Sequence, residues 1–142
     1  FTALNEVLEG VYGYSMNTQM PQVIVNKLTR AMRCQLYSTF IKADIKTFYA
    51  SINHEILYKK LHKRIRKEAI LKTILRALRT DSGQPNTLGA DEGNTVGIPE
   101  GLPISNILAN IYMFSLDEKF SKIPNCLFCR YVDDILILTD AS

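Results

Sequence analysis

Two adjacent aspartates interrupt an otherwise apolar stretch of the sequence. The run LFCRYVDDILIL, residues 127–138, has β-rich halves on either side of Asp133 and Asp134, and it predicts a β-hairpin. Aspartate has poor β-propensity, and burying its carboxylate costs free energy. An ordinary hairpin turn would favour Asp-Gly or Asn-Gly, and two adjacent carboxylates repel each other unless a cation neutralises them. The pair therefore indicates either an unusual turn or an acidic functional site.

A third aspartate lies at the end of a second predicted strand, which covers residues 39–45. Alternation along this strand places Asp44 on the face opposite Ile41, and we expect the Ile41 face to be buried under helices. By the same count, Tyr131 and Asp133 share one face of the hairpin. Neighbouring strands would let Asp44 and Asp133 meet, and carboxylate oxygens are the ligands that Mg²⁺ prefers. Two such ions can activate a primer 3′-hydroxyl and stabilise a leaving pyrophosphate.

Most of the remaining sequence predicts helices. Apolar spacing predicts helices over residues 3–12, 21–37 and 103–120, while glycine and proline punctuation predicts a loop or short hairpin over residues 81–97. The order helix, helix, strand, helix, helix, hairpin is an α+β layout.

The net charge of +3 is unevenly distributed along the chain. Residues 59–79 contain nine cations and one carboxylate, Glu68, so their net charge is +8, and the remaining residues must carry −5. Apolar spacing in this region predicts one long helix, or two with a break near Glu68, with Asn53 as a possible N-cap. The cations form either a solvated helix face or a stripe that faces phosphates or a partner.

Composition narrows the class of protein. The 142 residues, 46% hydrophobic and 22% charged, are typical of one globular domain or of a piece of something larger. No run of eighteen apolar residues and no signal peptide is visible, so we expect a cytoplasmic protein without a membrane partner. Three cysteines suit a reducing compartment. Cys126 and Cys129 lie three positions apart and would face opposite sides of a strand, which favours a core role over zinc binding.

Three segments resemble the motifs of the reverse transcriptase family. KADIKTFYASI (42–52), GIPEGLPISNILANIYM (97–113) and RYVDDILIL (130–138) resemble polymerase motifs A, B and C, in the family's order, over roughly residues 39–140. The chain is most similar to bacterial enzymes of the retron, group II intron and abortive-infection kinds. The resemblance implies a polymerase palm with a ferredoxin-like antiparallel sheet backed by helices, plus part of the fingers. Residues 1–38 would be a helical part of the fingers and 39–142 the palm, with the upstream fingers and downstream thumb outside the chain.

The resemblance also implies roles for single residues. Asp44 and Asp133 match the metal-binding aspartates, and Asp134 matches the neighbouring acid. Tyr49 matches the steric gate that excludes a ribose 2′-hydroxyl and so selects deoxynucleotides. The implied metal set is Asp44, Ile45, Asp133 and Asp134; the nucleotide-binding residues are Ile45, Lys46, Thr47, Phe48, Tyr49, Glu100 and Gly101; and the primer-proximal residues are Tyr131 and Val132.

The implied reaction is RNA-directed DNA synthesis with two Mg²⁺ ions, for which Mn²⁺ can substitute. Its partners would be an RNA template, a DNA primer, deoxynucleoside triphosphates and the remaining domains of the full-length polymerase, without which we expect the chain to be inactive.

Glu100 departs from the glutamine usual in motif B, and an anion beside a triphosphate is electrostatically unfavourable. Two alternatives stay open: a template-independent polymerase of the abortive-infection kind and a non-catalytic interaction module. The basic region 59–79 would lie on the outer face of the palm, against nucleic acid, another domain or water.

Overall fold

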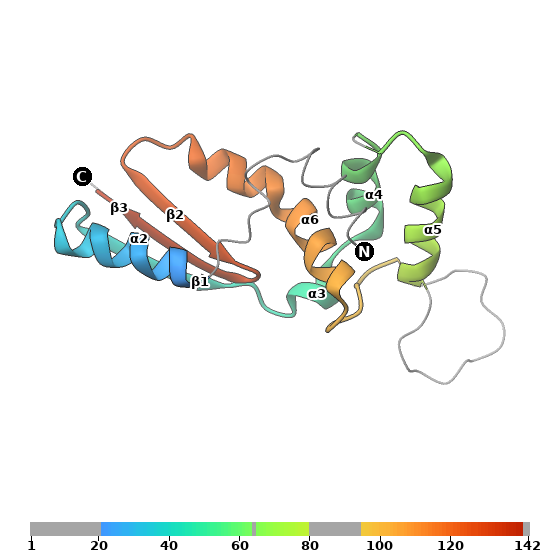
Figure 1. Cartoon of the computed structure of the whole chain (residues 1–142), viewed down its shortest axis with the longest axis horizontal. Helices are drawn as coiled ribbons and strands as arrows, with labels where there is room; N and C mark the ends of the chain where they lie inside the picture. The colour runs from blue at the N-terminus through green and yellow to red at the C-terminus, as the bar shows by residue number, and fades with distance from the viewer. Residues whose placement is uncertain (1–20, 64, 80–94, 141–142) are drawn as a thin grey trace. The chain divides into compact units, whose positions relative to one another are not determined.

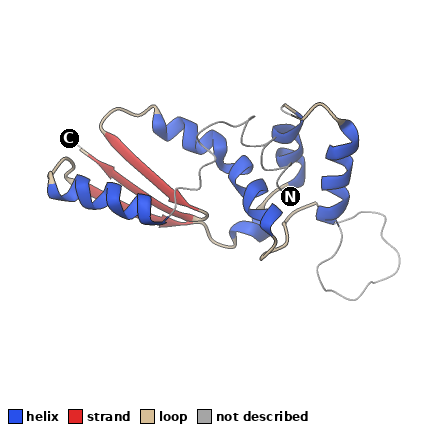
Figure 2. Ribbon diagram, in the orientation of Figure 1, coloured by secondary structure: helices blue, strands red, loops and turns tan. Residues whose placement is uncertain are grey.

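The structure is a computed structural model that describes residues 21–63, 65–79 and 95–140. These residues form an α+β fold with a three-stranded antiparallel sheet and helices, as predicted (Figure 1, Figure 2). The helix predicted over residues 3–12 and most of the segment 81–97 lie outside the described residues. No helix among the described ranges has the length and apolarity that a membrane span requires.

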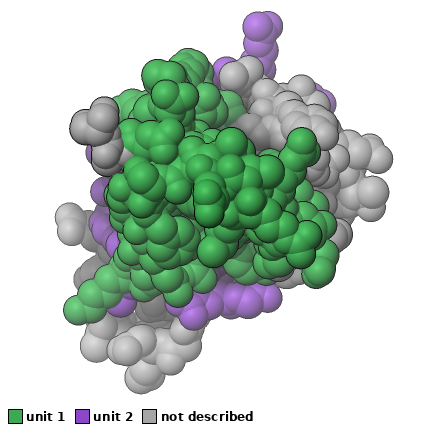
Figure 3. Space-filling view, turned by 90° about the vertical axis from the view of Figure 1, so that its left-hand side faces the viewer, with its two compact units in different colours: residues 1–46, 113–142 green, residues 47–112 purple. Residues whose placement is uncertain are grey.

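The chain divides into two compact units, coloured separately in Figure 3. The sheet unit comprises Phe1–Lys46 and Met113–Ser142, and the helical unit comprises Thr47–Tyr112. This division concerns compactness, so the predicted assignment of 1–38 to fingers and 39–142 to palm stays a prediction.

The sheet unit contains the predicted hairpin and the predicted first strand. The central strand is β3, and the order is β1-β3-β2, antiparallel throughout. Leu138 of β3 and Cys129 of β2 are buried in the core, and Phe128 stacks on Phe120 of α6 with ring centroids 4.6 Å apart. The elements of this unit are α2 (Pro21–Arg33), β1 (Thr39–Asp44), β2 (Cys126–Tyr131), β3 (Asp134–Thr139) and the end of α6 (Pro103–Ser121).

Two sequence predictions for this unit need correction. Helix α2 ends at Arg33 rather than at residue 37, because Gln35 has a φ of 46° and the Leu36 amide donates to the Ala31 carbonyl at 3.3 Å, a pairing that closes a helix. The Ile41 face of β1 is not buried among the described residues, since Ile41 is 45% exposed. Phe40 on the opposite face is 59% exposed, so neither face of β1 is buried among the described residues.

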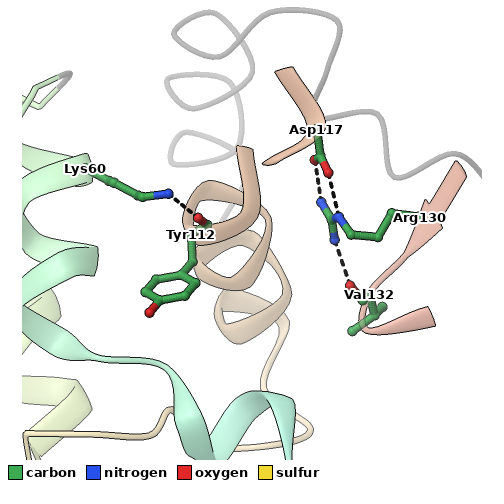
Figure 4. A network of polar contacts seen from close by, with 5 residues as sticks. All are labelled: Lys60, Tyr112, Asp117, Arg130 and Val132. Atoms are coloured by element: carbon green, nitrogen blue, oxygen red, sulfur yellow. Dashed lines mark hydrogen bonds and ion pairs between the residues drawn. The ribbon is translucent and has the colours of Figure 1, made fainter. Parts of the chain in front are cut away.

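In the helical unit, two helices rather than one carry the basic sequence, which selects between the two alternatives left open by the sequence. They are α4 (His54–His62) and α5 (Glu68–Arg79), preceded by the short helix α3 (Phe48–Ser51), which the sequence analysis did not predict. Asn53 is the N-cap of α4, as predicted, and its side chain accepts a hydrogen bond from the Ile56 amide at 3.0 Å. Lys60 of α4 donates to the Tyr112 carbonyl of α6 and lies 5.3 Å from that tyrosine's ring centroid (Figure 4).

Candidate active site

The strand ends of the sheet unit bring acidic residues together. Asp44 is the last residue of β1 and pairs in register with Asp134, the first residue of β3. Residues directly opposite in an antiparallel pair project to the same face, with Cβ atoms about 4.5–5.5 Å apart. The Ile45 amide donates to the Asp133 carbonyl at 3.3 Å. The backbone therefore holds Asp44, Ile45, Asp133 and Asp134 at one end of the sheet.

Asp133 lies in the hairpin turn and not in a strand, which changes the predicted facing of side chains. Strand β2 ends at Tyr131 and β3 begins at Asp134, and these two residues are register partners. Tyr131 therefore shares a face with Asp134 and not, as the alternation count predicted, with Asp133. The count was wrong because it ran through Val132 and Asp133 as if the strand were continuous.

The turn itself has a strained backbone. Val132 has a φ of 57°, and a β-branched residue is a genuine outlier in this left-handed region. Such conformations cost roughly 1–3 kcal/mol and persist where surrounding contacts impose them. A specific contact holds this turn.

That contact is made by Arg130, the residue before Tyr131. Figure 4 shows Arg130 reaching Asp117 of α6 on one side and Val132 on the other. Its Nε and Nη2 donate to the two carboxylate oxygens of Asp117 at 2.8 and 2.6 Å, and its Nη1 donates to the Val132 carbonyl at 2.8 Å. The Arg130 and Asp117 side chains are 7% and 18% exposed. A buried bidentate ion pair thus ties the turn that carries Asp133 to helix α6.

The acidic site is open to solvent, and a lysine pairs with one of its carboxylates. Asp44 and Asp134 are exposed and Asp133 is half-buried. Lys42 Nζ lies 4.0 Å from Asp134 Oδ1, an exposed ion pair of the kind that contributes about 0–1 kcal/mol. Lys42 therefore offsets only part of the negative charge of the three carboxylates.

The donor atoms suit a hard divalent cation, though the carboxylates do not converge on one point. Two carboxylates project from paired positions, and carboxylate and carbonyl oxygens are what Mg²⁺ takes while keeping several waters. Within the described part of the chain, no group of three or more His, Cys, Asp or Glu side chains is gathered closely enough to hold a metal ion. Asp44 and Asp134, with Asp133 adjacent in the turn and the neighbouring carbonyls, fit a site whose remaining positions belong to water and substrate.

The residues predicted to bind nucleotide lie mainly in the helical unit. Thr47 has a φ of 49° and precedes α3, so the chain changes direction immediately after Ile45 and Lys46. The Phe48 side chain is buried in the core, and the Phe48 carbonyl accepts a hydrogen bond from the Ser51 hydroxyl at 2.9 Å. The Tyr49 hydroxyl donates to Asn106 Oδ1 of α6, a contact between motifs A and B that fixes the tyrosine ring.

The segment that contains Glu100 is anchored at its start. The Gly97 amide donates to the Ile52 carbonyl at 2.8 Å, and the Ile98 amide donates to the Tyr49 carbonyl at 2.9 Å. Glu100 and Gly101 follow and are exposed. The segment is therefore fixed by backbone hydrogen bonds next to Tyr49, and Glu100 faces solvent.

Close packing at position 97 explains why this segment begins with a glycine. Its φ is 94°, and a Cβ on it would approach the Ala50 carbonyl oxygen at 3.3 Å. Buried His54 holds the same glycine, because its Nε2 hydrogen bonds with the Gly97 carbonyl. His54 thus does more than begin its helix.

Sequence reasoning missed several of these residues. Asp117 and Arg130 are thirteen positions apart on different elements, and only packing of α6 on the sheet brings them together. The one available signal was a basic residue inside an apolar strand. Asn106 and His54 likewise acquired their roles from contacts 57 and 43 positions distant.

The cysteines follow the predicted core role in part. Cys129 is buried and Cys126 is half-buried, and both thiols are free. Burial raises the pKa of the Cys129 thiol, an effect that nearby Lys27 partly opposes.

Comparison with known proteins identifies the class and then the family. The fold and the site together define an α+β chain with acidic residues gathered at the strand ends of an antiparallel sheet. Residues 1–142 match the family described as "Reverse transcriptase (RNA-dependent DNA polymerase)". The chain belongs to the reverse transcriptase family.

Two relatives are fungal intron proteins. The "Uncharacterized 91 kDa protein in cob intron" of Schizosaccharomyces pombe is 31% identical over 128 residues, which are 86% of this chain and 16% of that protein. The "Putative COX1/OXI3 intron 2 protein" of Saccharomyces cerevisiae is 30% identical over 95 residues, 64% of this chain and 11% of that protein. The chain therefore spans about a sixth or less of the curated relatives it matches. These relatives do not support a specifically bacterial type.

A solved structure shows the same fold. The apo telomerase of Candida tropicalis, truncated from the C-terminal domain, matches with a TM-score of 0.62 at 15% sequence identity, covering 99% of this chain and 34% of that one. At this identity the likeness concerns the fold alone, and it supports the α+β assignment.

Proposed function

We propose that the protein carrying this chain is an RNA-directed DNA polymerase, which transfers nucleotides from deoxynucleoside triphosphates to a primer 3′-hydroxyl on an RNA template. The observation that carries the proposal is the register pairing of Asp44 with Asp134, together with the Ile45–Asp133 backbone hydrogen bond. These contacts gather the acids of two separate motifs at one end of the sheet. Family membership supplies the reaction class.

Each acidic residue has a proposed role. Asp44, Asp133 and the Ile45 carbonyl would hold Mg²⁺, or Mn²⁺ in its place, and Asp134 would support the set. The bound metal would lower the pKa of the primer hydroxyl and neutralise charge on the triphosphate. The chain's own contribution is a strand end held by backbone hydrogen bonds, with Asp44 and Asp134 exposed where a substrate can reach them.

Selection of deoxynucleotides is proposed for Tyr49. Its ring is held by the hydroxyl contact with Asn106, and a fixed aromatic ring excludes a ribose 2′-hydroxyl by steric overlap. Tyr49→Ala should admit ribonucleotides, whereas Tyr49→Phe should keep most of the selection, because it retains the bulk of the ring and loses only the hydroxyl contact with Asn106. Incorporation of deoxy- and ribonucleotides on one template measures the difference.

The other predicted contacts with the nucleotide and the primer are also proposals. Lys46, Thr47, Phe48 and Gly101 would face the triphosphate through their backbones, and Tyr131 and Val132 would lie near the primer end. Glu100 is exposed, and we propose that it contacts the sugar or a cation rather than phosphate, since like charges repel. The intron relatives favour the group II intron kind over the retron and abortive-infection kinds. The cytoplasmic location stays a prediction.

Primer extension by the intact protein tests the proposed function. Extension should require RNA template, Mg²⁺ and deoxynucleotides, and should stop when the metal is chelated. Products made equally well without template would establish the template-independent alternative. No extension under any of these conditions would favour the non-catalytic interaction module.

A further inference from the structure

A strongly basic surface lies in the helical unit, on the turn between α4 and α5 and along α5. Glu68 is the one acid in the sequence from residue 59 to residue 79, and it accepts a hydrogen bond from the Tyr58 hydroxyl at 3.5 Å. The described exposed cations that define this basic surface are Lys63, Arg66, Lys67, Lys72 and Arg76.

Packing of α5 fixes the direction of the basic surface. Leu71, Ile74 and Leu78 are buried in the helical unit, so the other side of the helix must face outward. Lys72 and Arg76 lie one turn apart on that exposed side, separated by about 6 Å along the axis. This matches about two phosphate steps along one strand of a duplex, roughly 7 Å.

Four of the five cations of this surface differ from the exposed lysines on other described helix faces that pair with a glutamate. Elsewhere, exposed lysines pair with a glutamate one turn away, at 2.6 Å in Glu55–Lys59 and 2.8 Å in Glu118–Lys122. By contrast, four cations of the basic surface take part in none of the ion pairs between described residues: Lys63, Arg66, Lys67 and Lys72. Such crowding of like charges is unfavourable until a polyanion relieves it.

The composition of the surface identifies the polyanion. A membrane-bound amphipathic helix would present large apolar residues beside its cations, but the large apolar residues of α5 are mainly buried. Residues 59–79 contain no Phe, Tyr or Trp on which bases could stack. Contacts would therefore go to the backbone phosphates, as in sequence-independent recognition of a duplex.

We propose that the basic surface binds the phosphate backbone of a nucleic-acid duplex without sequence preference, through residues other than those of the acidic site. The inference goes beyond the proposed polymerase activity and does not depend on the aspartates. It gives a reason for the uneven charge of the sequence, in which residues 59–79 have a net charge of +8 and the remaining residues carry −5.

Salt-dependent binding by the intact protein tests this proposal. Fluorescence anisotropy with a labelled RNA duplex and a labelled DNA duplex, each of roughly 20 base pairs, would be followed across roughly 50–200 mM salt. The test variant is Lys63→Gln/Lys67→Gln/Lys72→Gln. The control variant removes the same charge from exposed lysines outside residues 59–79, Lys27→Gln/Lys119→Gln/Lys122→Gln. All proteins would carry Asp133→Asn, so that binding is read without synthesis.

The test variant should reduce the slope of log affinity against log salt by about 2–3, or close to one per lost phosphate contact. The control should leave the slope nearly unchanged. Whichever duplex binds more tightly, RNA or DNA, identifies the kind of nucleic acid that the basic surface recognises. An equal slope in test and control variants overturns the proposal. If the triple variant were misfolded by circular dichroism, Lys67→Gln alone should still lower the slope by about one, and no change there also refutes it. The polymerase assignment is tested separately, by primer extension with the wild-type protein, so failure of the duplex-binding proposal would leave that assignment standing.

Discussion

Replacing Arg130 with methionine is expected to loosen the hairpin that carries Asp133. Arg130 and Asp117 form a bidentate pair at 2.8 and 2.6 Å, with side chains only 7% and 18% exposed. Methionine fills the site but leaves the Asp117 carboxylate buried without its cation. Breaking a buried pair in this way costs about 3–5 kcal/mol. Since about 1.4 kcal/mol is a factor of ten, local opening should increase about 100-fold or more.

Hydrogen exchange of the intact protein, read by mass spectrometry on peptides from β2 and β3, measures that opening. The matched control is Lys122→Met, which breaks a pair of similar length, 2.8 Å to Glu118, whose side chains are 72% and 51% exposed. An exposed pair contributes about 0–1 kcal/mol, so the control should lose less than about five-fold in protection. Equal losses in Arg130→Met and Lys122→Met would refute the reasoning from burial.

A double variant separates stability from positioning. Replacing Asp117 with leucine in the Arg130→Met background removes the uncompensated charge, and substitution of both partners by apolar residues is often nearly neutral. Exchange protection should largely recover. The Arg130 hydrogen bond to the Val132 carbonyl stays absent, so kcat for primer extension should remain about ten-fold low while KM changes little. Full recovery of kcat would show that Arg130 acts through stability alone.

Further outcomes are expected at Gly97 and at the cysteines. Gly97→Ala should lower the melting temperature more than Gly101→Ala: both glycines have positive φ, but only Gly97 would bring a Cβ against the Ala50 oxygen, at 3.3 Å; equal losses would show that this contact costs nothing. Burial raises the pKa of the Cys129 thiol, because the folded state disfavours the thiolate. The free energy of unfolding therefore keeps its full value below the usual thiol pKa and falls as the pH rises above it. Stability should therefore fall less from about pH 8 to pH 10 in Cys129→Ala than in the wild type. At about pH 8, maleimide labelling followed by peptide mapping should modify exposed Cys34 and spare Cys129; labelling at equal rates would contradict the burial.

The sequence predicted the elements whose signals are local. Alternating apolar residues on either side of two aspartates predicted the hairpin, and Asn53 predicted the start of α4, because capping is decided by the side chain and the next few amides. The break near Glu68 was one of two alternatives, and the structure selects it.

What the sequence could not predict depends on contacts between distant residues or on one backbone angle. Asp133 was counted as a strand residue, since nothing local marks Val132 as left-handed. The end of α2 was missed because Gln35, not glycine, takes the left-handed position. The role of Arg130 could not be predicted, because it depends on Asp117, which α6 places beside it. The acids of the candidate site were identified by residue type, and their register pairing needed the structure.

The most direct test of the central claim compares two aspartate-to-asparagine changes in the sheet unit by primer extension with the intact protein. Asp133→Asn removes a proposed metal ligand. Asp140→Asn is the matched control, because Asp140 lies beyond the other end of β3, where its carboxylate oxygen accepts from the Ser38 amide at 3.1 Å, and asparagine can still accept. Metal assistance supplies several kcal/mol, so Asp133→Asn should lower kcat about 100-fold or more while Asp140→Asn stays near wild type. Equal extension by the two variants would contradict the assignment of the acidic strand ends as the catalytic site.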